Sequence, residues 1–244
     1  MNLVIDIGNT RVKLALFKGQ ELIFLLSEEP GSNKIWSEAK SYLDQVSQCL
    51  ISSVSDLPEV IRKILQQLHI QPLYLSEDTP LPFTNSYHSR TTLGYDRIAA
   101  IAGACQLHPG KDVLVIDAGT AITFDLKNSR EEYLGGNISP GLSMRFRALH
   151  DYTTKLPLLN TGETSSLLGN DTRSAILNGV QKGIIFETNT YIESLRNKYP
   201  ELVVLLTGGD SHFFDNKLKK PIFVLSNLTL LGLNFILRYN AEKL

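Results

Sequence analysis

The chain has only two cysteines, Cys49 and Cys105, which stand far apart and outside any C-x-x-C pattern. Neither a disulfide framework nor a structural zinc site is indicated by this spacing. The N-terminal residues also lack the basic stretch and the long apolar segment of a signal peptide. Because few cysteines and no leader fit a reducing compartment, we expect a cytoplasmic protein.

An excess of charge of either sign is absent as well, since the formal net charge is -1. Without a global electrostatic field to attract a polyanion, we expect a small-molecule substrate and no nucleic-acid partner. No long uninterrupted apolar run is present either. The most apolar tract, residues 221–237, contains Ser226, Asn227 and Asn234, so we predict a buried helix there and no membrane partner.

The P-loop pattern G-x-x-x-x-G-K-[ST] is missing too, which disfavours a P-loop kinase. What the chain does have is the composition of a globular protein, with 43% hydrophobic and 20% charged residues among 244. That length suits one large domain or two of ordinary size.

An internal repeat favours two halves, which we place at residues 1–112 and 113–244. The sequence VIDIGNT at residues 4–10 returns in outline as VIDAGT at residues 115–120. Each copy is an apolar strand, then Asp-x-Gly, then a small hydroxylic residue and a second apolar strand, which predicts a β-hairpin. With helices predicted between the strands, the chain belongs to the α/β class.

The two turns carry residues that suit phosphate binding. Glycine lets a ligand approach the backbone, Thr10 and Thr120 offer hydroxyls, and Lys13 supplies a cation. The backbone N–H groups of Gly8, Asn9 and Thr10 could hold phosphate oxygens. One such turn alone could be an ordinary hairpin turn, because glycine and asparagine are common there. The second copy favours a pair of phosphate-binding turns.

Three further motifs are weaker when each is taken alone. Gly94-Tyr95-Asp96-Arg97 precedes a predicted helix at residues 96–106, where an aspartate is favourable in any case. Residues 133–141 form a glycine-rich connection. Thr207-Gly208-Gly209 follows an apolar strand and is either a plain strand-to-helix turn or a place where adenine approaches the backbone.

Taken in order along nearly the whole chain, these motifs resemble those of the type III pantothenate kinases. The resemblance implies a duplicated actin-like ATPase fold, related to ribonuclease H, with two domains and mixed sheets. It also implies ATP-dependent phosphorylation of pantothenate to 4'-phosphopantothenate, the first step of coenzyme A biosynthesis. A homodimer with the site near its interface is a further expectation.

The resemblance assigns roles to individual residues. Asp96 would be the catalytic base. The substrate-binding residues would be Tyr87, Gly94, Tyr95, Asp96, Arg97 and Thr172. The ATP-binding residues would be Asp6, Ile7, Gly8, Asn9, Thr10, Arg11, Val12, Lys13, Thr120, Gly208 and Gly209. Asp117 would bind K⁺ or NH₄⁺, and Asp6 would lie on the Mg²⁺ side of the nucleotide. Thr172 could instead be the N-cap of a helix.

Two other functions stay open from the sequence. The chain could be a non-catalytic nucleotide-binding regulator, as Bvg accessory factor proteins of the same family were first described. An actin-like kinase for a different small molecule is the other possibility, because a fold does not define a substrate. The presence of both Asp96 and Arg97 argues against a regulator that has no need of a base.

Overall fold

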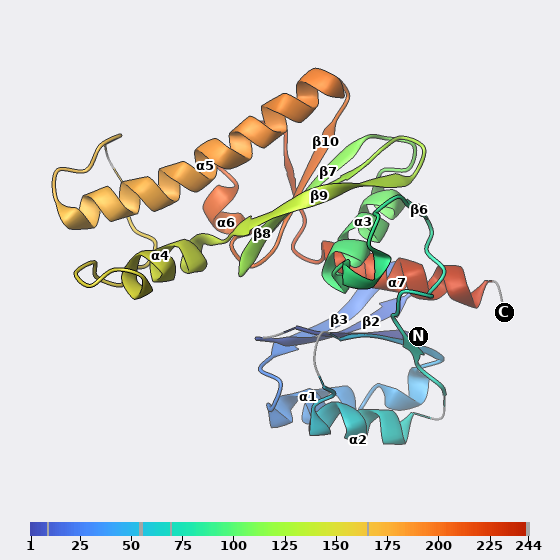
Figure 1. The fold of residues 1–244 in the computed structure, drawn as a ribbon. Helices are drawn as coiled ribbons and strands as arrows, with labels where there is room; N and C mark the ends of the chain where they lie inside the picture. Colours follow the sequence, from blue (N-terminus) through green and yellow to red (C-terminus); the bar gives the residue numbers. More distant parts are fainter. Residues whose placement is uncertain (9, 54–55, 69, 165, 243–244) are drawn as a thin grey trace. The chain divides into compact units, whose positions relative to one another are not determined.

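The computed structural model describes residues 1–242 except for residues 9, 54–55, 69 and 165. The chain divides into two compact units (Figure 1). One unit holds Met1–Pro109 together with the chain from Asn227 onward, and the other holds Gly110–Ser226.

The first unit is built on a mixed five-stranded sheet in the order β3-β2-β1-β4-β5. Its strands are β1 (Asn2–Ile7), β2 (Val12–Lys18), β3 (Glu21–Glu28), β4 (Gln48–Ser53) and β5 (Leu73–Tyr74). The predicted hairpin is present, because β1 pairs antiparallel with β2. On its other side β1 pairs parallel with β4.

Strand alternation gives this sheet two different faces. Leu3, Ile5 and Ile7 of β1 are buried in one core with Ile35 and Ile61. These last two residues lie on α1 (Asn33–Ala39) and α2 (Glu59–Gln67), which cover that face (Figure 1). The opposite face is covered by α3 (Tyr95–Leu107) and α7 (Leu228–Ala241). The alternate β1 residues therefore point toward α3 and α7.

Three short elements complete the described part of the first unit. They are the 3₁₀ helices at Leu43–Gln45 and Arg90–Thr92 and the two-residue strand β6 (Thr84–Asn85). The first of these follows α1, which ends at Ala39.

Helices α3 and α7 pack closely because glycine stands where they meet. A Cβ atom at Gly232 would lie 1.8 Å from the Ala99 carbonyl oxygen, and one at Gly103 would lie 2.6 Å from the Leu228 carbonyl oxygen. Asn2 of β1 also donates a hydrogen bond of 2.9 Å to Asn234 of α7. Helix α7 thus packs in the first unit. The predicted halves, residues 1–112 and 113–244, instead place this helix in the second half.

The second unit repeats the hairpin. Its described strands are β7 (Val113–Ala118), β8 (Ala121–Lys127), β9 (Glu132–Pro140), β10 (Val203–Thr207) and β11 (Phe223–Val224). Five strands of this unit are hydrogen-bonded in the order β11-β10-β7-β8-β9. As in the first unit, the first strand of the hairpin is antiparallel to the next strand and parallel to a later one. The predicted α/β class with mixed sheets is confirmed.

The helices of the second unit lie on one face of its sheet (Figure 1). They are α4 (Leu142–Asp151), α5 (Thr172–Lys198) and the short α6 (Ser211–Phe214). Leu114 and Ile116 of β7 share a core with Val180 and Ile184 of α5. The alternate residues of β7, which include Asp117, lie on the other face of the sheet.

One segment differs from its predicted structure. Residues 133–141 were predicted to be a connection, but most of them belong to β9, which pairs antiparallel with β8. Glycine, asparagine and proline are unfavourable in strands, so pairing with a regular neighbour overrides the local preference. No helix in the described part of the chain is long and apolar enough to cross a membrane.

We predict that Gly232→Ala destabilises the protein by about 1–3 kcal/mol, because the added methyl group forces α7 away from the Ala99 carbonyl. Urea unfolding measures the effect. The matched control is Gly183→Ala in α5, where a Cβ atom meets nothing within 4 Å. That change should leave stability unchanged or raise it by up to about 1 kcal/mol. Equal effects of the two changes would contradict the close packing of α3 and α7.

Candidate functional site

In the first unit, Asp6 lies in a line of polar side chains that runs across three strands. Its directly paired residues are Lys13 on β2 and Ser52 on β4. Paired residues project from the same face of a sheet, so all three side chains lie on the face that α3 and α7 cover. Ser52 is buried and was not among the predicted site residues, because only strand pairing brings it beside Asp6.

Burial raises the pKa of Asp6, and the nearby Asp96 carboxylate acts in the same direction. The Lys13 ammonium and a hydrogen bond with Ser52 lower that pKa, but burial is the larger effect. A half-buried carboxylate between a cation and a second carboxylate is a suitable ligand for a divalent metal that carries phosphate. The structure thus brings Asp6, Lys13 and Asp96 together within the first unit.

The first turn is closed by its own backbone. The Gly8 N–H donates a hydrogen bond of 3.0 Å to the Arg11 carbonyl oxygen. This bond stabilises the turn. Thr10 and Arg11 are exposed beyond it, and Asn9 lies outside the described residues.

Two other predicted ATP-binding residues flank this turn, and their side chains face away from it. Ile7 and Val12 are both 1% exposed and lie in the core beneath the sheet. Their side chains are therefore not available to a ligand.

The motif at residues 94–97 opens helix α3. Gly94 is its N-cap residue, and the exposed Asp96 lies in the first turn, where a negative charge is favourable. Asp96 Oδ1 accepts a hydrogen bond of 2.8 Å from the Arg97 N–H. A Cβ atom at position 94 would lie 2.4 Å from that same oxygen. Glycine at position 94 therefore leaves room for the carboxylate.

Arg97 and Tyr87 lie together although ten residues separate them. Arg97 is 5% exposed, and its Cζ atom lies 5.5 Å from the centroid of the half-buried Tyr87 ring. A guanidinium over an aromatic face is a cation–π contact. A buried guanidinium is also a strong binding group for a carboxylate. Tyr95 is the other tyrosine among the predicted substrate-binding residues. It is half-buried and lies two residues before Arg97 in the chain.

The second unit places Asp117 in an equivalent line of side chains. Asp117 pairs with Thr123 on β8 and with Thr207 on β10, and both threonines are buried. Carboxylate and hydroxyl oxygens are the donor type that hard cations prefer. Thr123 and Thr207 were missed as site residues, since neither lies in the Asp-x-Gly motif. As with Ser52, these residues are identified only by the register of the strands, which pairs them with the aspartate.

Two glycines approach the Asp117–Thr120 turn closely. Gly208 has φ of +94°, and a Cβ atom there would lie 2.5 Å from Asp117 Oδ1 and 2.3 Å from the Ala118 carbonyl oxygen. Gly141 donates a hydrogen bond of 3.1 Å from its N–H to the Thr120 carbonyl oxygen. The Thr120 side chain is exposed. Space around Gly209 is open, because a Cβ atom there meets nothing within 4 Å.

No cage for a metal made by the protein alone occurs among the described residues. They contain no group of three or more histidine, cysteine, aspartate or glutamate side chains placed to hold an ion. Mg²⁺ in phosphoryl-transfer sites commonly takes one or two carboxylates and completes its shell with water and phosphate. Asp6 fits that role, and Asp117 with its flanking threonines fits a monovalent ion.

Thr172 lies in the second unit, at the start of α5. The N-cap is the preceding Asp171, whose Oδ1 accepts a hydrogen bond of 2.8 Å from the Ser174 N–H. The alternative interpretation of Thr172 as an N-cap was therefore wrong. Thr172 instead lines a cavity of about 880 Å³ between α4 and α5, together with Arg145 and Tyr152.

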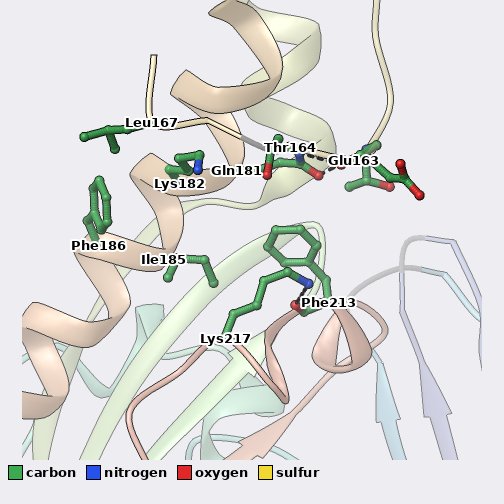
Figure 2. A pocket seen from close by; sticks show the side chains of 11 residues that line it. Glu163, Thr164, Leu167, Gln181, Lys182, Ile185, Phe186, Phe213 and Lys217 are labelled. Carbon is green, nitrogen blue, oxygen red and sulfur yellow. Dashed lines mark hydrogen bonds between the residues drawn. The ribbon is translucent and has the colours of Figure 1, made fainter. Parts of the chain in front are cut away.

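A second cavity in this unit, of about 1060 Å³, contains none of the predicted site residues (Figure 2). Its walls include Gln181, Lys182, Phe213 and Lys217. Lys217 donates to the Phe213 carbonyl oxygen, and its ammonium lies 4.3 Å from the centroid of that ring. Gln181 bonds both the N–H and the carbonyl of Gly162. The Lys217 ammonium and the Gln181 amide are therefore already hydrogen-bonded within the protein.

Comparison with known proteins gives a consistent family. The family model described as type III pantothenate kinase matches residues 2–194. A type III pantothenate kinase of Bacteroides fragilis is 46% identical over 246 residues, covering 100% of both chains. The protein of the same description from Christiangramia forsetii is 42% identical, also over 100% of both chains.

Solved structures give the fold. A crystal structure of a conserved Baf family protein from Campylobacter jejuni has a TM-score of 0.62 at 24% identity, covering 98% of this chain and 99% of that one. Component A of (R)-2-hydroxyglutaryl-CoA dehydratase from Acidaminococcus fermentans has a TM-score of 0.53 at 14% identity, covering 99% and 98%. The predicted actin-like ATPase fold is confirmed.

We predict that Asp6→Asn removes a pH-dependent cost to stability. Because the pKa of Asp6 is raised in the folded state, its stabilising contribution is present at low pH and lost as pH rises above the ordinary aspartate range of about 4. The advantage of the variant over the parent should therefore grow between about pH 4 and neutrality. Urea unfolding of both proteins across that range measures it, and a difference independent of pH would contradict the assignment.

Proposed function

Since the chain belongs to the type III pantothenate kinase family, we propose that it carries out the family reaction with Asp96 as general base. That reaction is ATP-dependent phosphorylation of pantothenate, the first step of coenzyme A biosynthesis, and it uses a divalent metal. The observation that carries the proposal is the position of Asp96. This carboxylate at the start of α3 is close enough to the first phosphate turn to raise the pKa of Asp6.

Asp96 accepts the proton of the pantothenate primary hydroxyl as that oxygen attacks the γ-phosphorus of ATP, while the bond from this phosphorus to the β–γ bridging oxygen breaks and ADP leaves. Its exposed carboxylate is available to a ligand, and its orientation is held by the Arg97 N–H and by the space over Gly94. A positioned carboxylate of this kind is an effective base because proton transfer accompanies bond formation.

Arg97 binds the carboxylate of pantothenate. Its guanidinium is buried against the Tyr87 ring, which restricts its orientation before the ligand arrives. An arginine fork matches a carboxylate with two parallel hydrogen bonds. Gly94 and Tyr95, which directly precede Asp96 and Arg97, contact the same substrate in this proposal.

Each unit's turn offers groups that suit ATP. In the first, the Thr10 N–H and the Lys13 ammonium contact phosphate, while the Gly8 N–H maintains the turn. In the second, Thr120 contacts the nucleotide, and Gly208 and Gly209 allow adenine to approach the backbone. Phosphoryl transfer depends mainly on such positioning and on neutralisation of charge.

Two cations complete the charge balance of the proposed site. Asp6 would hold Mg²⁺, and the divalent ion would supply neutralisation of the phosphate oxygens. Asp117, with Thr123 and Thr207 on either side, would hold K⁺ or NH₄⁺. Strand pairing holds the oxygens of Asp117, Thr123 and Thr207 side by side before ATP binds.

A homodimer is part of the proposal. The exposed large apolar side chains on α4, on α5 or in the chain between them include Tyr152, Leu158, Leu168 and Phe186. Exposed apolar side chains are the kind of surface that a subunit interface covers. Thr172 lines the cavity in the same region, so its predicted contact with pantothenate fits a site near that interface.

We predict that Asp96→Asn lowers kcat by about 10²- to 10⁴-fold, the usual contribution of a general base. The amide keeps the size of the side chain, so nucleotide binding and the unfolding midpoint should change little. Coupled measurement of ADP release with pantothenate as acceptor gives kcat. Asp44→Asn, at an exposed aspartate outside the site, is the matched control. Unaltered turnover of the Asp96 variant would remove this residue from the role of base.

We also predict that activity is lost when K⁺ and NH₄⁺ are replaced by tetramethylammonium, because Asp117 then lacks its ion. Asp117→Asn should abolish the response to added K⁺, whereas the exposed Asp44→Asn control should keep it. Titration of K⁺ into dialysed enzyme measures both. Full activity without either ion would contradict a cation at Asp117.

A further inference from the structure

The second phosphate turn is supported from outside by the junction between β9 and α4. Gly141 at this junction donates its N–H to the Thr120 carbonyl oxygen, at 3.1 Å. A Cβ atom at Gly141 would lie 2.3 Å from the Gly119 carbonyl oxygen and 2.4 Å from that of Thr120. The two backbones are therefore in direct contact, and movement of the junction is transmitted to the turn.

One side chain holds that junction in place. Arg145 of α4 donates from Nε to the Pro140 carbonyl oxygen at 2.8 Å and from Nη2 to Ser139 Oγ at 3.0 Å. The same Nη2 forms an ion pair of 2.5 Å with Glu187 of α5. Both charged side chains are more than two-thirds shielded from solvent, at 20% and 27% exposure. Arg145 thus joins the end of β9, the first turns of α4 and the long helix α5.

We propose that Arg145 is a positioning residue for ATP binding. It acts through Gly141 on the Thr120 carbonyl, and so sets the position of the Asp117–Thr120 turn. The inference rests on the proposed contact between Thr120 and the nucleotide. Helix α5 is the rigid support, because Glu187 fixes the guanidinium from that side.

Arg145→Met tests the inference, since methionine fills similar space without the donors or the charge. We expect the Kd for a non-hydrolysable ATP analogue, measured by calorimetry without pantothenate, to rise about tenfold, the effect of losing charge-assisted hydrogen bonds. The KM for ATP should rise in parallel, while the KM for pantothenate stays within about twofold. Arg145→Lys keeps a cation beside Glu187 but loses the fork, so it should recover part of the affinity.

Arg147→Met is the matched control, because Arg147 lies on the same helix and is exposed. It should leave nucleotide affinity unchanged. Should Arg145→Met fail to fold, Glu187→Gln removes the ion pair alone and should weaken nucleotide binding in the same direction. A nucleotide Kd unchanged in the Arg145 and Glu187 variants would overturn the inference.

Another outcome would also overturn it. Arg145 lines the α4–α5 cavity with Thr172, so a rise in the KM for pantothenate alone would place its role there. The binding measurement omits pantothenate, which keeps the two proposals separable. Wild-type protein that binds the ATP analogue but phosphorylates no pantothenate would contradict the function and leave the role of Arg145 open to the same binding test.

Discussion

The site depends on a carboxylate at the end of a central strand, on the sheet face that does not pack against the main apolar core. In β1 the alternation that buries Leu3, Ile5 and Ile7 under α1 and α2 directs Asp6 to the opposite face. In β7 the same alternation directs Asp117 away from the core of α5. Pairing with neighbouring strands then places polar side chains beside each carboxylate, so one local rule produces two sites.

The two copies have become chemically different. Lys13 and Ser52 flank Asp6, whereas two threonines flank Asp117. A lysine suits phosphate, and neutral hydroxyls suit a bound cation. Burial of Asp6 raises its pKa, which is a cost to the folded protein that a bound metal would offset. Close approaches at Gly94, Gly141 and Gly208 leave no room for a side chain at these three positions.

Much of this arrangement could be predicted from the sequence, because it is local. The hairpins, the helix that follows Gly94 and the repeated Asp-x-Gly turns all follow from short patterns. Strand register could not be read in the same way, so Ser52, Thr123 and Thr207 were missed. Strand β9 was missed because its glycines and proline disfavour a strand until β8 pairs with it. The place of α7 depends on the contact of Gly232 with α3, which is distant in sequence.

We propose that the kinase chemistry rests on the turns and on Asp96 and that Arg97 selects the acceptor, which family membership supports. A regulator that binds nucleotide without catalysis has no need of the base that we propose at Asp96. The most direct test offers the purified protein γ-labelled ATP, Mg²⁺ and K⁺ with pantothenate or with other small alcohols. The account predicts transfer of label to pantothenate as 4'-phosphopantothenate. Label on another alcohol, with none on pantothenate, would contradict it.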